Sequence, residues 1–285
     1  MKTQLSSNRI RLSEISIVIP VKDNQRGINN YLSAFFQTQQ ASFYPKEIII
    51  VDNNSSIPIN IDVSYANCGV KIKLLKCETP GPAAARNAGA TAADGEWILF
   101  NDSDCVPTKY LLSGYLKADN GSIAYAGNVK AFGNDKLSLY YESQEILVPL
   151  KTYSESGQCI PQYLITANCL IWKKAFNAVA GFNESISIAG GEDIDLGLRL
   201  AQQGDLSYAF DSIILHDFND GIVGFYKRFK RYGKGNKIIE QVWGTNMRPR
   251  PFRPNHKTSF NLLMAVLQYL FLLRGYQKGN DLKPS

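Results

Sequence analysis

Few of the residues that build disulfide or zinc frameworks are present in this 285-residue sequence. It contains five cysteines and two histidines, and no two cysteines form a Cys-x-x-Cys pair. An odd number of cysteines without paired spacing argues against a disulfide scaffold and against a structural zinc site. Reduced thiols are typical of a cytoplasmic protein, so we expect a cytoplasmic location, either free or at the cytoplasmic face of the membrane.

Long apolar runs are also scarce. Residues 1–12 are polar and lack the apolar segment of a secretory signal peptide. The C-terminal apolar segment, residues 260–273, would extend about 21 Å as a helix, whereas a bilayer core is roughly 30 Å thick. We therefore expect neither a signal peptide nor a transmembrane helix.

What the sequence does contain is an alternation of apolar strands and amphipathic helices. Residues 15–21, 47–51 and 97–100 are nearly continuous apolar runs, which are typical of parallel strands buried on both faces. Helical patterns separate these runs, so we predict an α/β fold with a mainly parallel, Rossmann-like sheet flanked by helices. Residues 151–161 are polar and predict a loop.

Acidic residues follow the predicted strands. Asp23, Asp52, Asp102 and Asp104 each come after an apolar run, and ligands of parallel α/β sheets bind at the carboxyl ends of strands. On an extended segment Asp102 and Asp104 would point the same way, and a divalent cation commonly reconciles two such charges. The alternatives are an acidic loop that caps the next element and, for Asp52, an Asx-turn.

Other polar residues suggest further parts of a site, each with a structural alternative. His216 follows a strand and could complete a metal site, which favours Mn²⁺ somewhat over Mg²⁺, or it could be a histidine bonded at the edge of the core. Arg86 lies in the first turns of a helix, as a neighbour of a diphosphate or in a surface ion pair. Glu192 and Asp193 begin a helix, where acids are often only caps.

Five segments, in this order along the chain, resemble the motifs of family 2 GT-A glycosyltransferases. They are residues 52–55 (DNNS), 81–89 (GPAAARNAG), 94–104 (DGEWILFNDSD), 181–184 (GFNE) and 190–200 (GGEDIDLGLRL). Each motif alone is weakly specific, but five in the right order are a strong signal. The resemblance runs from about residue 15 to residue 216.

The resemblance implies a GT-A domain that transfers a sugar from a nucleoside-diphosphate donor with inversion at the anomeric carbon. By this resemblance Asp193 is the catalytic base, supported by Glu192, and Asn168 and Glu192 contact the acceptor. Asp104, His216 and Asp102 would hold Mn²⁺ or Mg²⁺. The residues expected to bind the nucleotide sugar are Pro20, Asp23, Asp52, Asn53, Arg86, Asn87, Asp102 and Ser103.

The sequence also departs from the family pattern. Cys105 stands where many relatives have another acid, and Asn183 replaces a common aspartate. The C-terminal region lacks the multiple apolar spans of processive synthases. We therefore expect transfer of a single sugar, with UDP-sugars weakly favoured, to a saccharide or a lipid-linked acceptor.

The basic residues are concentrated near the C-terminus. The chain has a net charge of +6, and residues 227–257 contain ten basic residues and one acid. With the apolar segment that follows, this suggests a peripheral contact with an anionic membrane. The alternative is a helix packed on its own domain. Because no nucleic-acid-binding motif accompanies the charges, we expect no nucleic-acid partner.

We therefore predict a catalytic domain over residues 1–218, with a nucleotide-binding half at about 13–107 and an acceptor-binding half at about 108–218. Residues 219–285 would form a basic, amphipathic helical extension. Two other functions stay open. A sugar nucleotidyltransferase also uses an α/β sheet and Mg²⁺, but the Gly-rich, Lys-bearing N-terminal loop expected for it is missing. A non-catalytic binding protein would keep the fold without the chemistry.

Overall fold

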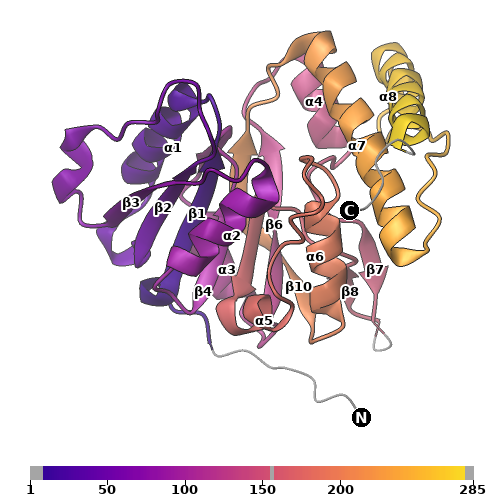
Figure 1. The fold of residues 1–285 in the computed structure, drawn as a ribbon. Helices are drawn as coiled ribbons and strands as arrows, with labels where there is room; N and C mark the ends of the chain where they lie inside the picture. Colours follow the sequence, from indigo (N-terminus) through magenta and orange to yellow (C-terminus); the bar gives the residue numbers. More distant parts are fainter. Residues whose placement is uncertain (1–8, 155–156, 280–285) are drawn as a thin grey trace.

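The computed structural model describes residues 9–154 and 157–279 and is organised around one eight-stranded sheet (Figure 1). Residues 1–8, on which most of the signal-peptide prediction rests, lie outside the described chain. The strands are β1 (Ile15–Val21), β2 (Glu47–Asp52), β3 (Lys71–Lys76), β4 (Trp97–Asn101), β5 (Cys105–Pro107), β6 (Ala124–Ala131), β7 (Lys151–Tyr153), β8 (Cys159–Pro161), β9 (Asn168–Trp172) and β10 (Leu206–His216).

Helices cover both faces of this sheet, and α1 and α2 lie on opposite faces (Figure 1). The helices are α1 (Gln25–Thr38), α2 (Pro82–Ala92), α3 (Leu111–Ala118), α4 (Lys136–Ser143), α5 (Lys173–Ala178), α6 (Glu192–Ala201), α7 (Gly221–Trp243) and α8 (Ser259–Lys278). Short 3₁₀ turns occupy Leu12–Glu14, Ala41–Phe43 and Val63–Asn67.

The strand order is β3-β2-β1-β4-β9-β6-β10-β5. The first four strands are parallel, and so are β6 and β10, whereas β9 and β5 are antiparallel to their neighbours. Both β2 and β4 are buried along their whole length, as their continuous apolar runs require. The predicted α/β fold with a mainly parallel sheet is confirmed.

Parallel pairing brings the ends of β1, β2 and β4 to one edge of the sheet. Val21, at the end of β1, pairs with Asp52, at the end of β2. Asp23 and Asp102 follow at the same edge, one after β1 and the other after β4. The expected gathering of strand-end acids therefore occurs.

One local prediction was wrong. Residues 151–161 include a small antiparallel hairpin, in which Thr152 pairs with Ile160. Its strands have three residues each, too few for a period-two pattern to stand out from a polar loop. The apolar run over residues 163–172 is a strand only from Asn168, where β9 begins. Ile165 and Thr166 leave the sheet and line a cavity instead.

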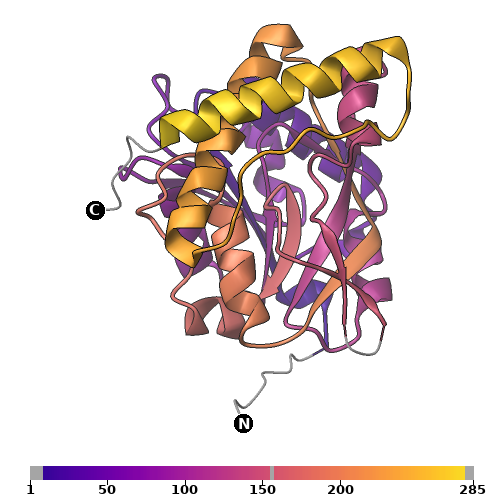
Figure 2. The same cartoon turned by 90° about the vertical axis from the view of Figure 1, so that its right-hand side faces the viewer.

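The two C-terminal helices cross each other closely, and α8 lies across the molecule on top of α7 (Figure 2). A side chain on Gly233 of α7 would come 2.0 Å from the Leu272 carbonyl oxygen, and one on Gly275 of α8 would come 2.0 Å from the Lys230 carbonyl oxygen. Glycine at both positions lets the helix backbones approach. Within residues 9–154 and 157–279, no helix is long and apolar enough to cross a membrane.

Candidate active site

A cavity of about 1030 Å³ lies at the strand-end edge of the sheet. Its volume matches the upper range of small-molecule sites. Ten of the thirteen residues predicted for the site line it. These are Pro20, Asp23, Asn53, Arg86, Asp102, Ser103, Asp104, Glu192, Asp193 and His216. The cavity is therefore the candidate active site.

The segment between β4 and β5 is a turn, so Asp102 and Asp104 do not share the direction expected for an extended strand. Asp102 faces the guanidinium of Arg86, at 2.8 Å from Oδ1 to Nη2. The turn is held by Asn24, which caps α1 and donates to the carbonyl oxygen of Ser103. Asn24 was not among the residues predicted for the site, although an asparagine before a helical pattern is a recognisable cap signal.

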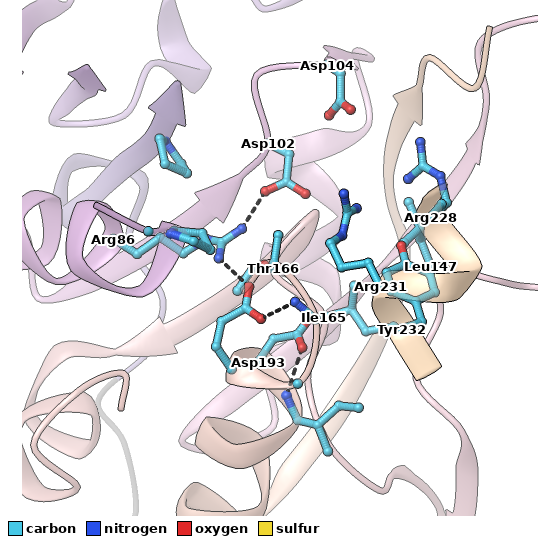
Figure 3. A pocket seen from close by; sticks show the side chains of 18 of the residues that line it. Arg86, Asp102, Asp104, Leu147, Ile165, Thr166, Asp193, Arg228, Arg231 and Tyr232 are labelled. Atoms are coloured by element: carbon cyan, nitrogen blue, oxygen red, sulfur yellow. Dashed lines mark hydrogen bonds and ion pairs between the residues drawn. The ribbon is translucent and has the colours of Figure 1, made fainter. Parts of the chain in front are cut away.

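A buried ionic network links α2 to α6. Arg86 binds Asp102 (Figure 3) and also Glu192, at 2.8 Å from Nη1 to Oε1. Burial alone would lower the pKa of Arg86. The carboxylates of Asp102 and Glu192 raise this pKa by more than burial lowers it, so the pKa lies above its ordinary value and the guanidinium stays charged. The surface ion pair considered for Arg86 is excluded because the side chain is buried.

The two acids at the start of α6 have different surroundings. One oxygen of Glu192 binds Arg86, and the other accepts the N–H of Gly190 at 2.7 Å. Oδ1 of Asp193 accepts only the N–H of Ile194, and no donor in the described part of the chain reaches Oδ2. Burial and the neighbouring Glu192 charge raise the pKa of Asp193 to about 7. Asp193 is thus the acid with an oxygen available to a ligand.

The start of α6 is fixed by a close approach of α7. Gly191 has a φ of 107°, in the region that favours glycine, and precedes the first residue of the helix. A side chain on Gly235 of α7 would come 2.2 Å from the Gly190 carbonyl oxygen. Gly235 on α7 and the two glycines of the preceding loop, Gly190 and Gly191, therefore let α7 lie directly against the loop that presents Glu192 and Asp193.

The antiparallel pairing of β5 and β10 builds the candidate metal site. Cys105 pairs with His216, which brings Asp104 Oδ1 to 3.3 Å from His216 Nε2. Ligand atoms of Asp104, Cys105 and His216 all lie within 4.8 Å of one another. One carboxylate and one imidazole are ligands that a divalent cation can use. Burial and the charges of Asp104 and Asp102 raise the pKa of Cys105, which disfavours its thiolate as a ligand.

Three predicted site residues do not line the cavity. Asp52 accepts the N–H groups of Ser55 and Ile59, the Asx-turn arrangement that the sequence left open. Asn87 binds the backbone of Phe182 and so fixes the loop before α6. Asn168 is buried and accepts a hydrogen bond from Tyr115. All three act on the backbone or core around the cavity.

Helix α7 contributes cavity residues that were not predicted from the sequence, notably Arg228, Arg231 and Tyr232. The two arginines extend from α7 toward the side where Asp102 and Asp104 lie (Figure 3). Among the described residues, Nε of Arg228 and Nε of Arg231 are buried without a hydrogen-bond partner. The basic character of this segment suggested a contact with an anionic membrane or, as the alternative, a helix packed on its own domain with a solvated face.

The segment beyond residue 218 also lines the cavity through α8, from which Gln268 and Leu272 come. The residues expected to form an appended extension therefore form one wall of the site. The boundaries of the two halves of the catalytic domain stay a prediction.

The fold is that of the GT-A glycosyltransferases, as comparison with solved structures shows. A mannosyltransferase, PcManGT from Pyrobaculum calidifontis in complex with GDP-Man and Mn²⁺, superimposes with a TM-score of 0.58 at 13% identity, over 98% of this chain and 77% of that one. S. aureus TarS 1-349 in complex with UDP-GlcNAc gives a TM-score of 0.54 at 16% identity, over 94% and 74% of the two chains.

The sequence matches the model of glycosyl transferase family 2 over residues 16–179. The chain belongs to this family. A pre-mycofactocin glycosyltransferase of Mycobacterium tuberculosis is 26% identical over 77% of this chain and 46% of its own length. An uncharacterised glycosyltransferase of Rickettsia conorii is 26% identical over 96% and 43%. The chain thus spans less than half the length of these relatives.

Proposed function

We propose that this chain transfers a single sugar from a nucleoside-diphosphate donor to a hydroxyl of a saccharide or lipid-linked acceptor, with inversion. The observation that supports this best is the position of Asp193. Its carboxylate faces the cavity in which Asp102 and Asp104 lie on another side (Figure 3). A pKa raised to about 7 suits a general base at neutral pH.

In the proposed reaction Asp193 accepts the proton of the acceptor hydroxyl. The hydroxyl oxygen forms a bond to the anomeric carbon while the bond from that carbon to the diphosphate oxygen breaks, and the electron pair leaves with the nucleoside diphosphate. Attack from the face opposite the leaving group inverts the configuration. No covalent bond to the protein is needed.

The charges around the cavity favour this leaving group. Asp104 and His216 fit a divalent cation, which when bound would offset the charge of the diphosphate. Arg228 and Arg231 place two further cations on the same side of the cavity, each with a buried, unpartnered Nε. We propose that these two guanidinium groups donate to diphosphate oxygens. The relatives bound to UDP-GlcNAc and to GDP-Man support a nucleotide-sugar donor, without deciding which one.

The proposal predicts that nucleoside diphosphate is released from a nucleotide sugar in the presence of Mn²⁺ or Mg²⁺. A panel of UDP- and GDP-sugars is first screened for metal-dependent thermal stabilisation, and release is then measured with the stabilising donors. Release of pyrophosphate from a nucleoside triphosphate would indicate a sugar nucleotidyltransferase instead. Absence of any metal-dependent nucleotide binding would favour a non-catalytic protein.

Replacing Asp104 by Asn is expected to abolish metal-dependent stabilisation by the nucleotide and to lower kcat/KM by about 10² or more, since a catalytic metal contributes several kcal/mol. Asp104 is partly exposed, so the fold should tolerate the change. Asp211→Asn is the matched control, because Asp211 is an exposed acid whose ion-pair partner is Lys117, away from the cavity lining. Equal metal response in both variants would contradict the assigned metal site.

A further inference from the structure

The outer face of α8 is an exposed apolar stripe. Leu262, Leu263, Val266 and Leu270 are 46%, 57%, 56% and 47% exposed. Leu263, Val266 and Leu270 come one, four and eight residues after Leu262, which puts all four within about 100° on one side of the helix. These four residues are named the α8 stripe.

The opposite side of α8 is held by the rest of the protein. Met264, Ala265 and Gln268 are buried, and Gln268 accepts a hydrogen bond of 2.7 Å from the Tyr140 hydroxyl. The orientation of the helix is therefore fixed by its inner side, so the stripe cannot turn inward without breaking these contacts. Apolar side chains left together on a fixed, outward face indicate an interaction surface.

The chain around the stripe has charges of only one sign. Residues 244–278 contain six basic residues and no acid. All six are exposed, and no carboxylate in the described part of the chain forms an ion pair with any of them. They are Arg248, Arg250, Arg253, Lys257, Arg274 and Lys278.

The basic segment and α8 lie on the same side of the molecule (Figure 2). Residues 244–258 run beside α8 on the face turned toward the viewer in Figure 2. An exposed aromatic residue, Phe252, lies within this basic segment between Arg250 and Arg253. An apolar stripe bordered by unpaired cations is the composition of a helix that lies in the interface of an anionic bilayer.

We propose that α8 and residues 244–258 bind the surface of an anionic lipid bilayer, with α8 parallel to the membrane plane and its stripe among the acyl chains. A second copy of the chain is a poor occupant, because pairing two such faces would bring twelve like charges together without an acid in either segment. In a bilayer, anionic headgroups would form ion pairs with the basic side chains, and the upper acyl region would bury the apolar side chains of the α8 stripe.

This orientation has a consequence for the cavity. Gln268 and Leu272, on the inner side of α8, line the cavity, so the site lies about one helix diameter, roughly 10 Å, from the bilayer surface. A hydroxyl on a lipid-linked acceptor would be within reach of such a site. The binding itself requires neither nucleotide nor metal, and it is independent of the proposed reaction.

The test is co-sedimentation of the chain with vesicles of phosphatidylcholine alone and of phosphatidylcholine mixed with phosphatidylglycerol. We expect binding to the mixed vesicles, weakening as salt is raised, and little binding to the neutral ones. Arg250→Gln with Arg253→Gln should weaken binding about 25-fold, at roughly fivefold per charge. Leu263→Ser with Val266→Ser should weaken it by about tenfold or more.

The matched control is Ile57→Ser with Val63→Ser, since these residues are 81% and 88% exposed and lie outside α8 and the basic segment. It should bind vesicles like the unaltered chain. All variants replace exposed residues, and thermal unfolding checks that each is folded. Equal binding to neutral and anionic vesicles, or no binding to either at low salt, would overturn the proposal. So would a self-association in lipid-free buffer that the stripe variant abolishes.

The outcome is separable from that of the proposed function. If the chain transferred sugar but did not bind vesicles, only the proposed membrane-binding surface would be refuted. If the chain bound vesicles but transferred no sugar, the membrane-binding surface would be supported and the proposed reaction would be refuted.

Discussion

Asp193→Asn is expected to lower kcat by about 10² to 10⁴, the usual contribution of a general base, while nucleotide binding is retained. The amide has nearly the shape of the carboxylate but cannot accept the acceptor proton. Asn can still accept the N–H of Ile194, which Oδ1 of Asp193 now accepts, so the start of α6 should keep its geometry. The measurements are steady-state kinetics and nucleotide affinity.

The same assignment predicts the pH dependence. Because the pKa of Asp193 is raised to about 7, kcat/KM of the unaltered chain should fall as pH decreases below about 7 and the base becomes protonated. Asp193→Asn should lose this acidic limb. Asp211→Asn, the exposed control, should keep both the rate and the pH profile.

The raised pKa of Asp193 also predicts how the free energy of unfolding depends on pH. A carboxyl group with a higher pKa in the folded state than in the unfolded state destabilises the fold when it is ionised. This cost is absent below the unfolded pKa and grows as pH rises toward about 7. Asp193→Asn should therefore increase the free energy of unfolding at pH 8 more than at pH 4. An inactive variant without this pH-dependent gain would contradict the proposed environment of Asp193, and an active variant would contradict its role.

The acids at the strand ends could be predicted from the sequence because the signals that place them are local. A continuous apolar run predicts a buried strand, and the parallel arrangement brings the ends of such strands to one edge. Asp102, Asp104 and His216 all follow or end strands, so their meeting needs only the strand order. The turn after β4 could not be predicted from local pattern. Because of this turn, Asp102 contacts Arg86 and Asp104 contacts His216.

The wall formed by α7 and α8 could not be predicted in the same way. Lys and Arg residues on an amphipathic helix usually lie on a solvated face, and Arg228 and Arg231 follow the same pattern. Their inward position depends on how α7 lies against the loop before α6 and against α8. That packing is possible because Gly235 and Gly233 have no side chain. The backbone groups that they contact, at Gly190 and Leu272, are far away in the sequence.

Side-chain direction explains the three predicted residues that do not line the cavity. Asp52 has backbone donors within seven residues, and these take its carboxylate. Asn168 lies on a strand that is antiparallel to its neighbours, and its amide donates to the carbonyl oxygens of Asn128 and Ser212. Motif resemblance gave the position of each residue in the chain but not the direction of its side chain.

Arg86→Met is expected to lower the free energy of unfolding by about 3 to 5 kcal/mol, the usual cost of removing one partner of a buried ion pair. Methionine fills much of the volume of arginine without its charge. Glu192 would stay buried with only the N–H of Gly190 as partner, and Asp102 would lose its cation. The measurement is chemical unfolding at constant pH and salt.

A second variant separates the charge from the packing. Arg86→Met combined with Glu192→Gln should recover part of the loss, because the carboxylate that the single change leaves uncompensated is then neutral. Lys76→Met is the matched control: Lys76 forms an exposed pair with Glu78, and such pairs contribute at most about 1 kcal/mol. If Arg86→Met were no more destabilising than Lys76→Met, the network would not join α2 to α6 as described. If the double variant were as unstable as the single one, the loss would come from packing around Arg86, since the buried charge of Glu192 would then contribute little.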